Sequence, residues 1–195
     1  MKRLLDLTIS IIVTIFISPL LLLLALIIKV DSTGPVFYLQ ERIGKNRVPF
    51  RIFKFRTMYV NADKQGLLTV GERDARITRV GVLLRKYKLD ELPQLFNVMV
   101  GNMSLVGPRP EVRKYVDLYS EEQLKVLRVK PGITDYASIE YANENQLLGN
   151  VSNPEEVYVN EIMPAKLLLN LKYIEEQSLM TDLMILLKTV RKIVS

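Results

Sequence analysis

The sequence predicts a mostly helical α+β fold, in which an N-terminal re-entrant membrane helix-break-helix precedes a small α/β globular domain with interfacial amphipathic helices. Residues 7–28 are uncharged and almost entirely aliphatic, which is typical of a membrane segment. Short stretches between residues 36 and 58 resemble strands, and later segments carry apolar residues at helical spacing. The expected division is a membrane hairpin over residues 1–30 and a globular domain over residues 31–195.

The apolar segment is long enough to cross a bilayer once, since about 20 apolar residues span the hydrocarbon. No small-residue cleavage site ends it, so we do not expect a cleaved signal peptide. Ser18 and Pro19 lie in its middle, where a proline removes a backbone donor and bends or breaks a helix. Two interpretations are open: a kinked single-span anchor, and a re-entrant hairpin that places residues 30–195 on the same side of the membrane as Met1.

Composition limits the chemistry that the chain can perform. It has no cysteine and no histidine, which excludes disulfides, thiolate nucleophiles, His-based triads and imidazole ligation of zinc. A metal would be a hard cation held by oxygen atoms. The net charge of +6 favours phosphate-bearing molecules or anionic lipid, and no stretch has the pattern of a nucleic-acid-binding module, so we expect no nucleic acid partner.

The first segments after the membrane hairpin are predicted from turn residues and short apolar runs. In order, they are a turn at 31–35, a strand at 36–40, a turn at 44–46, a strand at 50–58 and an exposed loop with short helical pieces at 61–78. Strand alternation puts Phe53 and Phe55 on one face of the second strand and Lys54 and Arg56 on the other.

The later segments are predicted to be mainly helical. In order, they are a helix at 83–88, a helix between Asp90 and Gly101, an extended turn at 107–110, a helix at 111–128, strand and loop at 133–153, two helices beginning near Pro154 and Pro164, and a helix at 179–194. Asp90 is the expected N-cap of its helix, with Pro93 in the first turn and Gly101 as the stop.

Two interpretations are open for the helix at 179–194. Its apolar residues form one stripe, which consists of Leu183, Leu186, Leu187, Val190 and Val194. Basic residues gather near its end, so the helix could lie in the bilayer interface. A core helix with a solvated basic face is the more common arrangement of such a pattern.

A carboxylate pair, Asp90 and Glu91, lies between two groups of cations. Those before and after it are Arg42, Lys45, Arg47, Arg51, Lys54, Arg56, Arg79, Arg85, Lys86, Lys88, Arg109 and Arg113. Such cations suit a diphosphate substrate, and an ionised carboxylate beside bound phosphate can attack phosphorus. A helix cap followed by an ordinary first-turn acid is the more common explanation of an Asp-Glu dipeptide, so the pair alone is a weak signal.

Four motifs in chain order make the signal specific. They are KFRTM at 54–58, LDELPQLFNV at 89–98, GNMSLVGPRP at 101–110 and KPGIT at 130–134. Together they resemble the bacterial sugar transferase family, and more closely the small monotopic polyprenyl-phosphate phosphoglycosyl transferases. The similarity extends over nearly the whole chain.

The resemblance implies a reaction and a location. A sugar-1-phosphate would pass from a UDP-sugar donor to a polyprenyl (undecaprenyl) phosphate acceptor with release of UMP, as the first membrane step of surface glycan or glycoprotein glycan assembly. The protein would lie in the bacterial inner membrane, contacting the phospholipid bilayer, with a catalytic domain on the cytoplasmic face. A homodimer is the assembly considered, and the sequence does not determine it.

The resemblance also implies roles for particular residues. Asp90 would be the nucleophile, forming a covalent phosphosugar intermediate, and a ligand of Mg²⁺; Glu91 would be its catalytic partner. The residues expected to hold phosphates are Lys54, Arg56, Arg85 and Arg109. Ser18 and Pro19 match the membrane helix break, which favours the same-side topology.

The chain departs from the family pattern at residues 135–145, where many relatives read Gly-Trp-Ala-Gln-Val and often carry an arginine. This loop leaves the donor sugar undetermined. Two alternatives to the covalent mechanism are direct attack by the lipid phosphate, with the pair as metal site and base, and a non-enzymatic basic membrane adaptor.

Overall fold

The computed structural model describes residues 1–62, 66, 68 and 74–194, and there the fold is mostly helical with two small sheets, as predicted. The helices are α1 (Lys2–Asp31), α2 (Arg79–Lys86), α3 (Gln94–Val100), α4 (Arg113–Val116), α5 (Tyr136–Glu140), α6 (Glu144–Gly149), α7 (Pro154–Val157), α8 (Met163–Glu176) and α9 (Leu179–Val194). Shorter or irregular helical turns are η1 (Lys45–Arg47), η3 (Leu89–Glu91), η4 (Gln123–Arg128) and η5 (Tyr158–Ile162). The strands are β1 (Phe37–Ile43), β2 (Pro49–Phe55), β3 (Ser104–Val106) and β4 (Gly132–Thr134).

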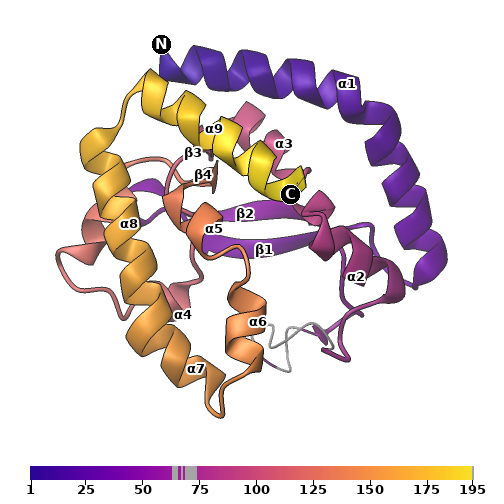
Figure 1. Cartoon of the computed structure of the whole chain (residues 1–195). Helices are drawn as coiled ribbons and strands as arrows, with labels where there is room; N and C mark the ends of the chain where they lie inside the picture. Colours follow the sequence, from indigo (N-terminus) through magenta and orange to yellow (C-terminus); the bar gives the residue numbers. More distant parts are fainter. Residues whose placement is uncertain (63–65, 67, 69–73, 195) are drawn as a thin grey trace.

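Helix α1 is continuous but bent (Figure 1), so the expectation of two helices separated by a break is corrected. Pro19 has no N–H to donate to the carbonyl of Ile15, four residues earlier. The Ser18 hydroxyl donates to that carbonyl instead, at 2.8 Å. Ser18 and Pro19 therefore bend the helix without interrupting it. The helix is long and apolar enough to cross a membrane, with a mean hydropathy of 3.1 over a window that is only 11% buried.

Polar side chains attach the N-terminal end of α1 to the globular part. The Lys2 ammonium donates to the carbonyl of Val106 at 3.1 Å and forms an ion pair with Asp182 of α9. The buried carboxylate of Asp6 accepts a hydrogen bond from the Ser104 hydroxyl at 2.7 Å. These charged groups hold the first turns of an otherwise apolar helix against β3 and α9.

Arg56 attaches the other end of α1. Its guanidinium donates to the carbonyl of Ser32 at 2.7 Å and to that of Thr33, at the C-terminal end of the helix. A cation there interacts favourably with the helix dipole and with carbonyls that lack intrahelical partners. Arg56 is 5% exposed and its Nε has no hydrogen-bond partner among the described residues, so its expected contact with phosphate stays a prediction.

The hairpin of β1 and β2 is antiparallel, with Phe37 opposite Phe55 and Ile43 opposite Pro49. Phe53 and Phe55 lie on one face, as the alternation predicted: Phe37 stacks on Phe55 at 5.5 Å between ring centroids and meets Phe53 edge-on at 6.4 Å. The hairpin therefore presents Lys54 on the face opposite this aromatic cluster.

Strands β3 and β4 are parallel and hold the extended turn at 107–110. The N–H of Gly107 donates to the carbonyl of Thr134, and the N–H of Gly132 donates to that of Pro108, both at 3.0 Å. A Cβ atom on Gly132 would lie 2.1 Å from the nitrogen of Gly107, so this approach of the two backbones requires glycine. The sheet thereby fixes the backbone that carries Arg109.

Two predicted segments are corrected. The helix expected at 111–128 is divided into α4 and η4, because Ser120 and Gln123 exchange backbone–side-chain hydrogen bonds and start a new helical turn. Residues 133–153, expected as strand and loop, form β4 and then α5 and α6, since Asp135 caps α5 by accepting from the Ser138 N–H at 2.6 Å. Half of the loop expected at 61–78 lies outside the described residues.

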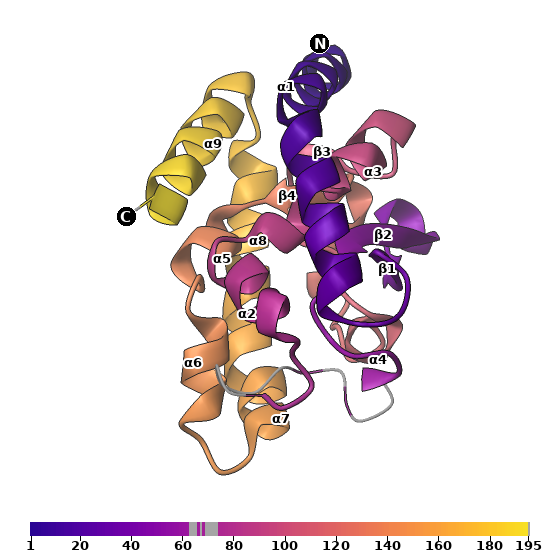
Figure 2. The ribbon, with the colours of Figure 1, turned by 90° about the vertical axis from the view of Figure 1, so that its right-hand side faces the viewer.

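Helix α9 exposes three residues of its predicted apolar stripe, whereas Leu186 is partly buried against the core and the side chain of Val194 is outside the described part of the chain. Leu183, Leu187 and Val190 are each more than half exposed, whereas Ile185 on another face is fully buried. Figures 1 and 2 place α9 at the same end of the molecule as the first half of α1, whose apolar residues are also exposed. An outward apolar stripe beside an exposed apolar helix favours the interfacial interpretation over the core interpretation. The first-turn positions of Pro154 in α7 and Pro164 in α8 are confirmed.

Candidate active site

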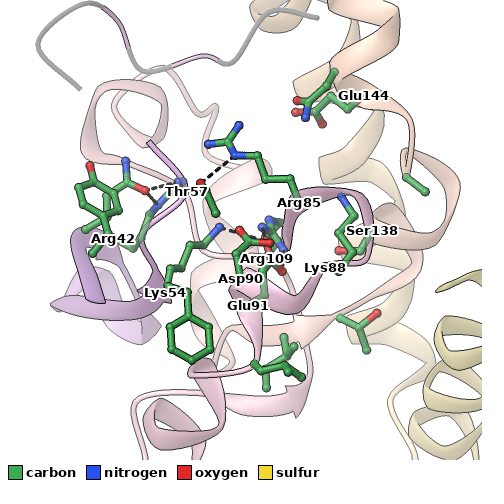
Figure 3. Close-up of a pocket in the computed structure, with 18 of the residues that line it drawn as sticks. Arg42, Lys54, Thr57, Arg85, Lys88, Asp90, Glu91, Arg109, Ser138 and Glu144 are labelled. Atoms are coloured by element: carbon green, nitrogen blue, oxygen red, sulfur yellow. Dashed lines mark hydrogen bonds and ion pairs between the residues drawn. The ribbon is translucent and has the colours of Figure 1, made fainter. Parts of the chain in front are cut away.

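A cavity of about 850 Å³ is lined by residues from many segments of the described chain, chiefly α1, β1, β2, α2, η3, α5, α6, α8, α9 and the turn after β3. Lys54, Arg85, Asp90, Glu91 and Arg109, which the sequence singled out, all line it (Figure 3). Arg56 lines the cavity as well, so segments far apart in the sequence place one carboxylate pair among all four of the expected cations.

Asp90 lies in η3 and does not cap α3, which corrects the sequence-based expectation. Lys88 adopts a left-handed backbone conformation, with φ of 55°, and the chain then forms the tight turn η3 before α3 begins at Gln94. The predicted stop at Gly101 is confirmed, with φ of 98°. Because Asp90 caps no backbone N–H, its carboxylate remains available to the cavity.

Glu91 is the paired carboxylate. The Lys54 ammonium donates to it at 3.0 Å, and both terminal nitrogens of Arg109 donate to it, one of them at 3.0 Å. Burial opposes ionisation of Glu91, but the charges of Arg109 and Lys54 outweigh this effect and hold its pKa well below the ordinary value. Glu91 therefore stays ionised and fixes the two cations.

Asp90 contrasts with its neighbour. It is 7% exposed and, among the described residues, its carboxylate accepts no hydrogen bond. Burial raises its pKa above the ordinary value, and the charges of Lys54, Arg85 and Lys88 oppose that rise. A buried carboxylate that faces a cavity without a protein hydrogen bond is suited to a nucleophile or a metal ligand.

Asn97 is a positioning residue that the sequence reasoning missed. It is fully buried in α3; its amide accepts from the N–H of Phe53 at 2.8 Å and donates to the carbonyl of Arg51 at 2.7 Å. These bonds fix β2 next to Lys54. The available signal was a polar residue between the apolar Leu95 and Val98 on a helix face predicted to be buried.

Arg85 of α2 lies beside the segment that follows β2, with its Nε donating to the Thr57 hydroxyl at 2.9 Å (Figure 3). Burial lowers the pKa of Arg85 from its very high ordinary value. Together with Lys54 and Arg109 it gives this part of the cavity an excess of positive charge, which suits phosphate oxygens.

The carboxylates that line the cavity could hold Mg²⁺ if substrate phosphates supplied further oxygen ligands. The described residues contain no group of three or more acidic side chains that could enclose a metal ion. Mg²⁺ commonly binds through one or two carboxylates plus substrate phosphates and water. Asp90 offers such a carboxylate, whereas Glu91 is already occupied by two cations. The site therefore suits a magnesium ion that arrives with a diphosphate.

A second polar group lines another part of the cavity. The Glu111 carboxylate accepts from Arg42 at 2.7 Å and from the Tyr158 hydroxyl at 2.6 Å, and Lys166 donates to Glu144 at 2.6 Å. The sequence counted Arg42 among the cations suited to a diphosphate and placed Glu144 in the divergent loop, but it did not predict that these residues pair across distant segments. Each carboxylate here is neutralised by one cation, Glu111 by Arg42 and Glu144 by Lys166, whereas the cations around Asp90 outnumber the carboxylates.

A third part of the cavity is apolar. Val13 of α1, Leu105 and Ile133 of the parallel strands, and Leu186 and Val190 of α9 line it. Both helices also carry exposed apolar residues, so this part of the cavity lies beside the surface expected to meet lipid.

Comparisons with known proteins agree with these features. A family model described as bacterial sugar transferase matches residues 1–195. The chain is 39% identical over 197 residues to the UDP-N-acetylgalactosamine-undecaprenyl-phosphate N-acetylgalactosaminephosphotransferase of Aeromonas hydrophila, covering 100% of the chain and 44% of the relative. It is 40% identical over 192 residues to the UDP-glucose:undecaprenyl-phosphate glucose-1-phosphate transferase of Caulobacter vibrioides, covering 97% and 68%. The protein of that same description from Escherichia coli (strain K12) is 36% identical over 195 residues, covering 98% and 40%. The chain thus spans less than half the length of two of these three relatives.

Proposed function

This chain belongs to the bacterial sugar transferase family, and we propose that it moves a sugar-1-phosphate from a UDP-sugar to undecaprenyl or another polyprenyl phosphate. The observation that carries the proposal is the unequal treatment of two adjacent carboxylates. Glu91 is held by Lys54 and Arg109, whereas Asp90 faces the same cavity with no protein hydrogen bond. One carboxylate is fixed as a counter-ion, and the other is left to react.

In the first step, an Asp90 oxygen attacks the sugar-proximal phosphorus of the donor. A bond forms between that oxygen and phosphorus, and the bond between phosphorus and the bridging oxygen breaks, so UMP leaves with the bridging oxygen and its electron pair. Lys54, Arg85 and Arg109 neutralise the phosphate oxygens during this step. The product is an acyl phosphate between Asp90 and the sugar phosphate.

In the second step, an oxygen of the polyprenyl phosphate attacks the same phosphorus. The bond to Asp90 breaks, the carboxylate is regenerated, and the polyprenyl diphosphate sugar leaves. The apolar part of the cavity beside α1 and α9 supports the entry of this acceptor from the membrane. Both steps use one phosphorus position, so the donor and the acceptor phosphate share the site around Asp90.

Asp90 and the donor diphosphate would hold Mg²⁺, which when bound reduces the repulsion between anionic oxygens. Glu91 keeps Lys54 and Arg109 charged and oriented toward that same position. Metal removal by a chelator should abolish UMP release, and added Mg²⁺ should restore it.

The attachment of α1 supports the re-entrant topology with the catalytic domain on one face of the bacterial inner membrane, the cytoplasmic one. Lys2 and Asp6 fix the start of α1 to the globular part, and Arg56 fixes its end to the same body. A helix that crossed the bilayer would separate its ends by roughly 30 Å of hydrocarbon. The bend at Pro19 lets both ends remain on one side.

The function is tested by incubating purified protein with Mg²⁺ and individual UDP-sugars and measuring UMP. We expect about one equivalent of UMP without acceptor, a mass increase on Asp90 equal to the sugar phosphate, and turnover once undecaprenyl phosphate is added. Asp90→Asn should remove all three signals. Asp117→Asn, at an exposed aspartate outside the cavity, is the matched control and should retain them.

Other outcomes separate the alternatives. Turnover with acceptor but no adduct and no UMP from donor alone would indicate direct attack by the lipid phosphate. An active Asp90→Asn variant would exclude Asp90 as nucleophile. Absence of binding and turnover with every UDP-sugar would favour the membrane adaptor.

A further inference from the structure

The cavity is divided by charge, and one part of it has no role in the phosphate chemistry. Around Asp90 the cations outnumber the carboxylates, and near α1 and α9 the lining is apolar. Between α5, α6 and α8 the lining is polar but balanced, because Glu144 and Lys166 neutralise each other at 2.6 Å. A neutral polar surface is a poor site for a phosphate and a good one for a neutral hydroxyl-bearing group.

The Ser138 hydroxyl gives a second, independent indication that a ligand binds in this part of the cavity. Its Oγ atom is buried, lines this part of the cavity and has no hydrogen-bond partner among the described residues. A buried hydroxyl without a partner costs free energy, so such atoms in proteins commonly meet a ligand or water. Its backbone N–H is satisfied by Asp135, which holds the residue in place and leaves the hydroxyl free to serve a ligand.

The balanced region lies close to the reacting position. Arg109, which donates to Glu91, has its pKa raised mainly by Glu91 and, to a smaller extent, by Asp135 and Glu144. The Glu144 carboxylate is therefore within electrostatic range of the phosphate-binding cluster. Figure 3 draws Ser138 and Glu144 on the side of the acidic pair away from Arg42.

We propose that Ser138, Glu144 and Lys166 form the subsite that recognises the sugar of the donor and selects among sugars. The Glu144 carboxylate would accept hydrogen bonds from sugar hydroxyls, and Lys166 would donate to a hydroxyl or acetamido oxygen. The Ser138 hydroxyl would gain from the sugar the hydrogen bond that it lacks among the described residues. This inference rests on the proposed function, since it assumes a donor phosphate at Asp90. The nucleoside lies elsewhere, beyond the bridging oxygen that leaves.

Ser138→Ala is the most selective test. Because the hydroxyl has no hydrogen-bond partner in the part of the chain that the structure describes, its removal should leave the melting temperature unchanged and lower kcat/KM for the preferred donor by about three- to tenfold. Glu144→Gln keeps the size of the side chain and should lower that value by about ten- to a hundredfold. Glu155→Gln, which breaks an exposed ion pair with Lys114 outside the cavity, is the matched control and should change neither quantity.

The decisive measurement compares four donors, UDP-glucose, UDP-galactose, UDP-N-acetylglucosamine and UDP-N-acetylgalactosamine, by UMP release. We expect Ser138→Ala and Glu144→Gln to change the ratios of kcat/KM between donors, with the inhibition constant of UMP unchanged. Equal losses for all four donors would overturn the inference, and a weakened inhibition by UMP would assign the region to the nucleoside instead. If the unmodified protein released UMP from none of the four, and from no other UDP-sugar, the proposed function would fall together with this inference; retained activity with unchanged ratios would remove the inference alone.

Discussion

The two adjacent carboxylates are expected to affect stability in opposite directions when each is replaced by its amide. Glu91→Gln removes the counter-charge of Lys54 and Arg109 and leaves both cations in a partly buried cluster. Removing one partner of a fully buried ion pair costs about 3–5 kcal/mol; we expect about 2–4 kcal/mol here, because the Arg109 side chain keeps 32% of its exposure. For a chain of this size that loss corresponds to a decrease in melting temperature of about 4–16 °C.

Asp90→Asn should leave the melting temperature at neutral pH equal to or above that of the unmodified protein. Burial raises the folded-state pKa of Asp90 above its unfolded value, so above both values the ionised group destabilises the fold. The substitution removes that charge and breaks no hydrogen bond among the described residues. It should nevertheless abolish adduct formation, since an amide cannot act as the nucleophile.

The assay is thermal unfolding of both variants in the same detergent at neutral pH and without substrate, beside UMP release. Glu122→Gln serves as control, because its ion pair with Lys125 is exposed and contributes about 1 kcal/mol or less. A decrease in the melting temperature of Asp90→Asn as large as that of Glu91→Gln would refute the reasoning. It would mean that Asp90 is held by partners in the folded protein.

Three further predictions concern positioning, protonation and membrane shape. Asn97→Ala removes the side-chain partner of two partly buried backbone groups, the Phe53 N–H and the Arg51 carbonyl, and should cost about 1–3 kcal/mol in chemical denaturation, whereas Asn102→Ala, at an exposed site, should cost little. The value of kcat/KM should fall on the acid side at a pH above the ordinary aspartate pKa, since Asp90 must be ionised. Lys54→Gln should move this acid-side fall in kcat/KM to higher pH, because the Lys54 charge lowers the pKa of Asp90. Single cysteines introduced at the two ends of α1 are expected to label from one side of the membrane when Pro19 is present. Pro19→Ala should straighten the helix, so that the two cysteines become accessible from opposite sides.

Much of the secondary structure could be predicted because it depends on local patterns. The apolar run, the alternation around Phe53 and Phe55, and the stop at Gly101 are short-range signals, and each corresponds to an element in the structure. The family motifs identified Asp90 and Glu91, and Lys54 and Arg109 lie beside them in one cavity. The helix at 111–128 was predicted too long because the capping pair of Ser120 and Gln123 went unrecognised.

Tertiary contacts decided what each polar residue does. Lys54 and Arg56 belong to one motif, yet Lys54 pairs with Glu91 while Arg56 binds carbonyls at the end of α1, and no sequence pattern separates the two. Likewise, adjacency in sequence made Asp90 and Glu91 look alike, but only the fold supplies Arg109 to Glu91 and leaves Asp90 without a hydrogen bond from any described residue. Composition and motifs determined the family, the long apolar segment and the carboxylate pair proposed for the chemistry. The packing of α1, the hairpin and the parallel strands determined which charges meet, because ion pairs between distant segments depend on the folded backbone that brings them together.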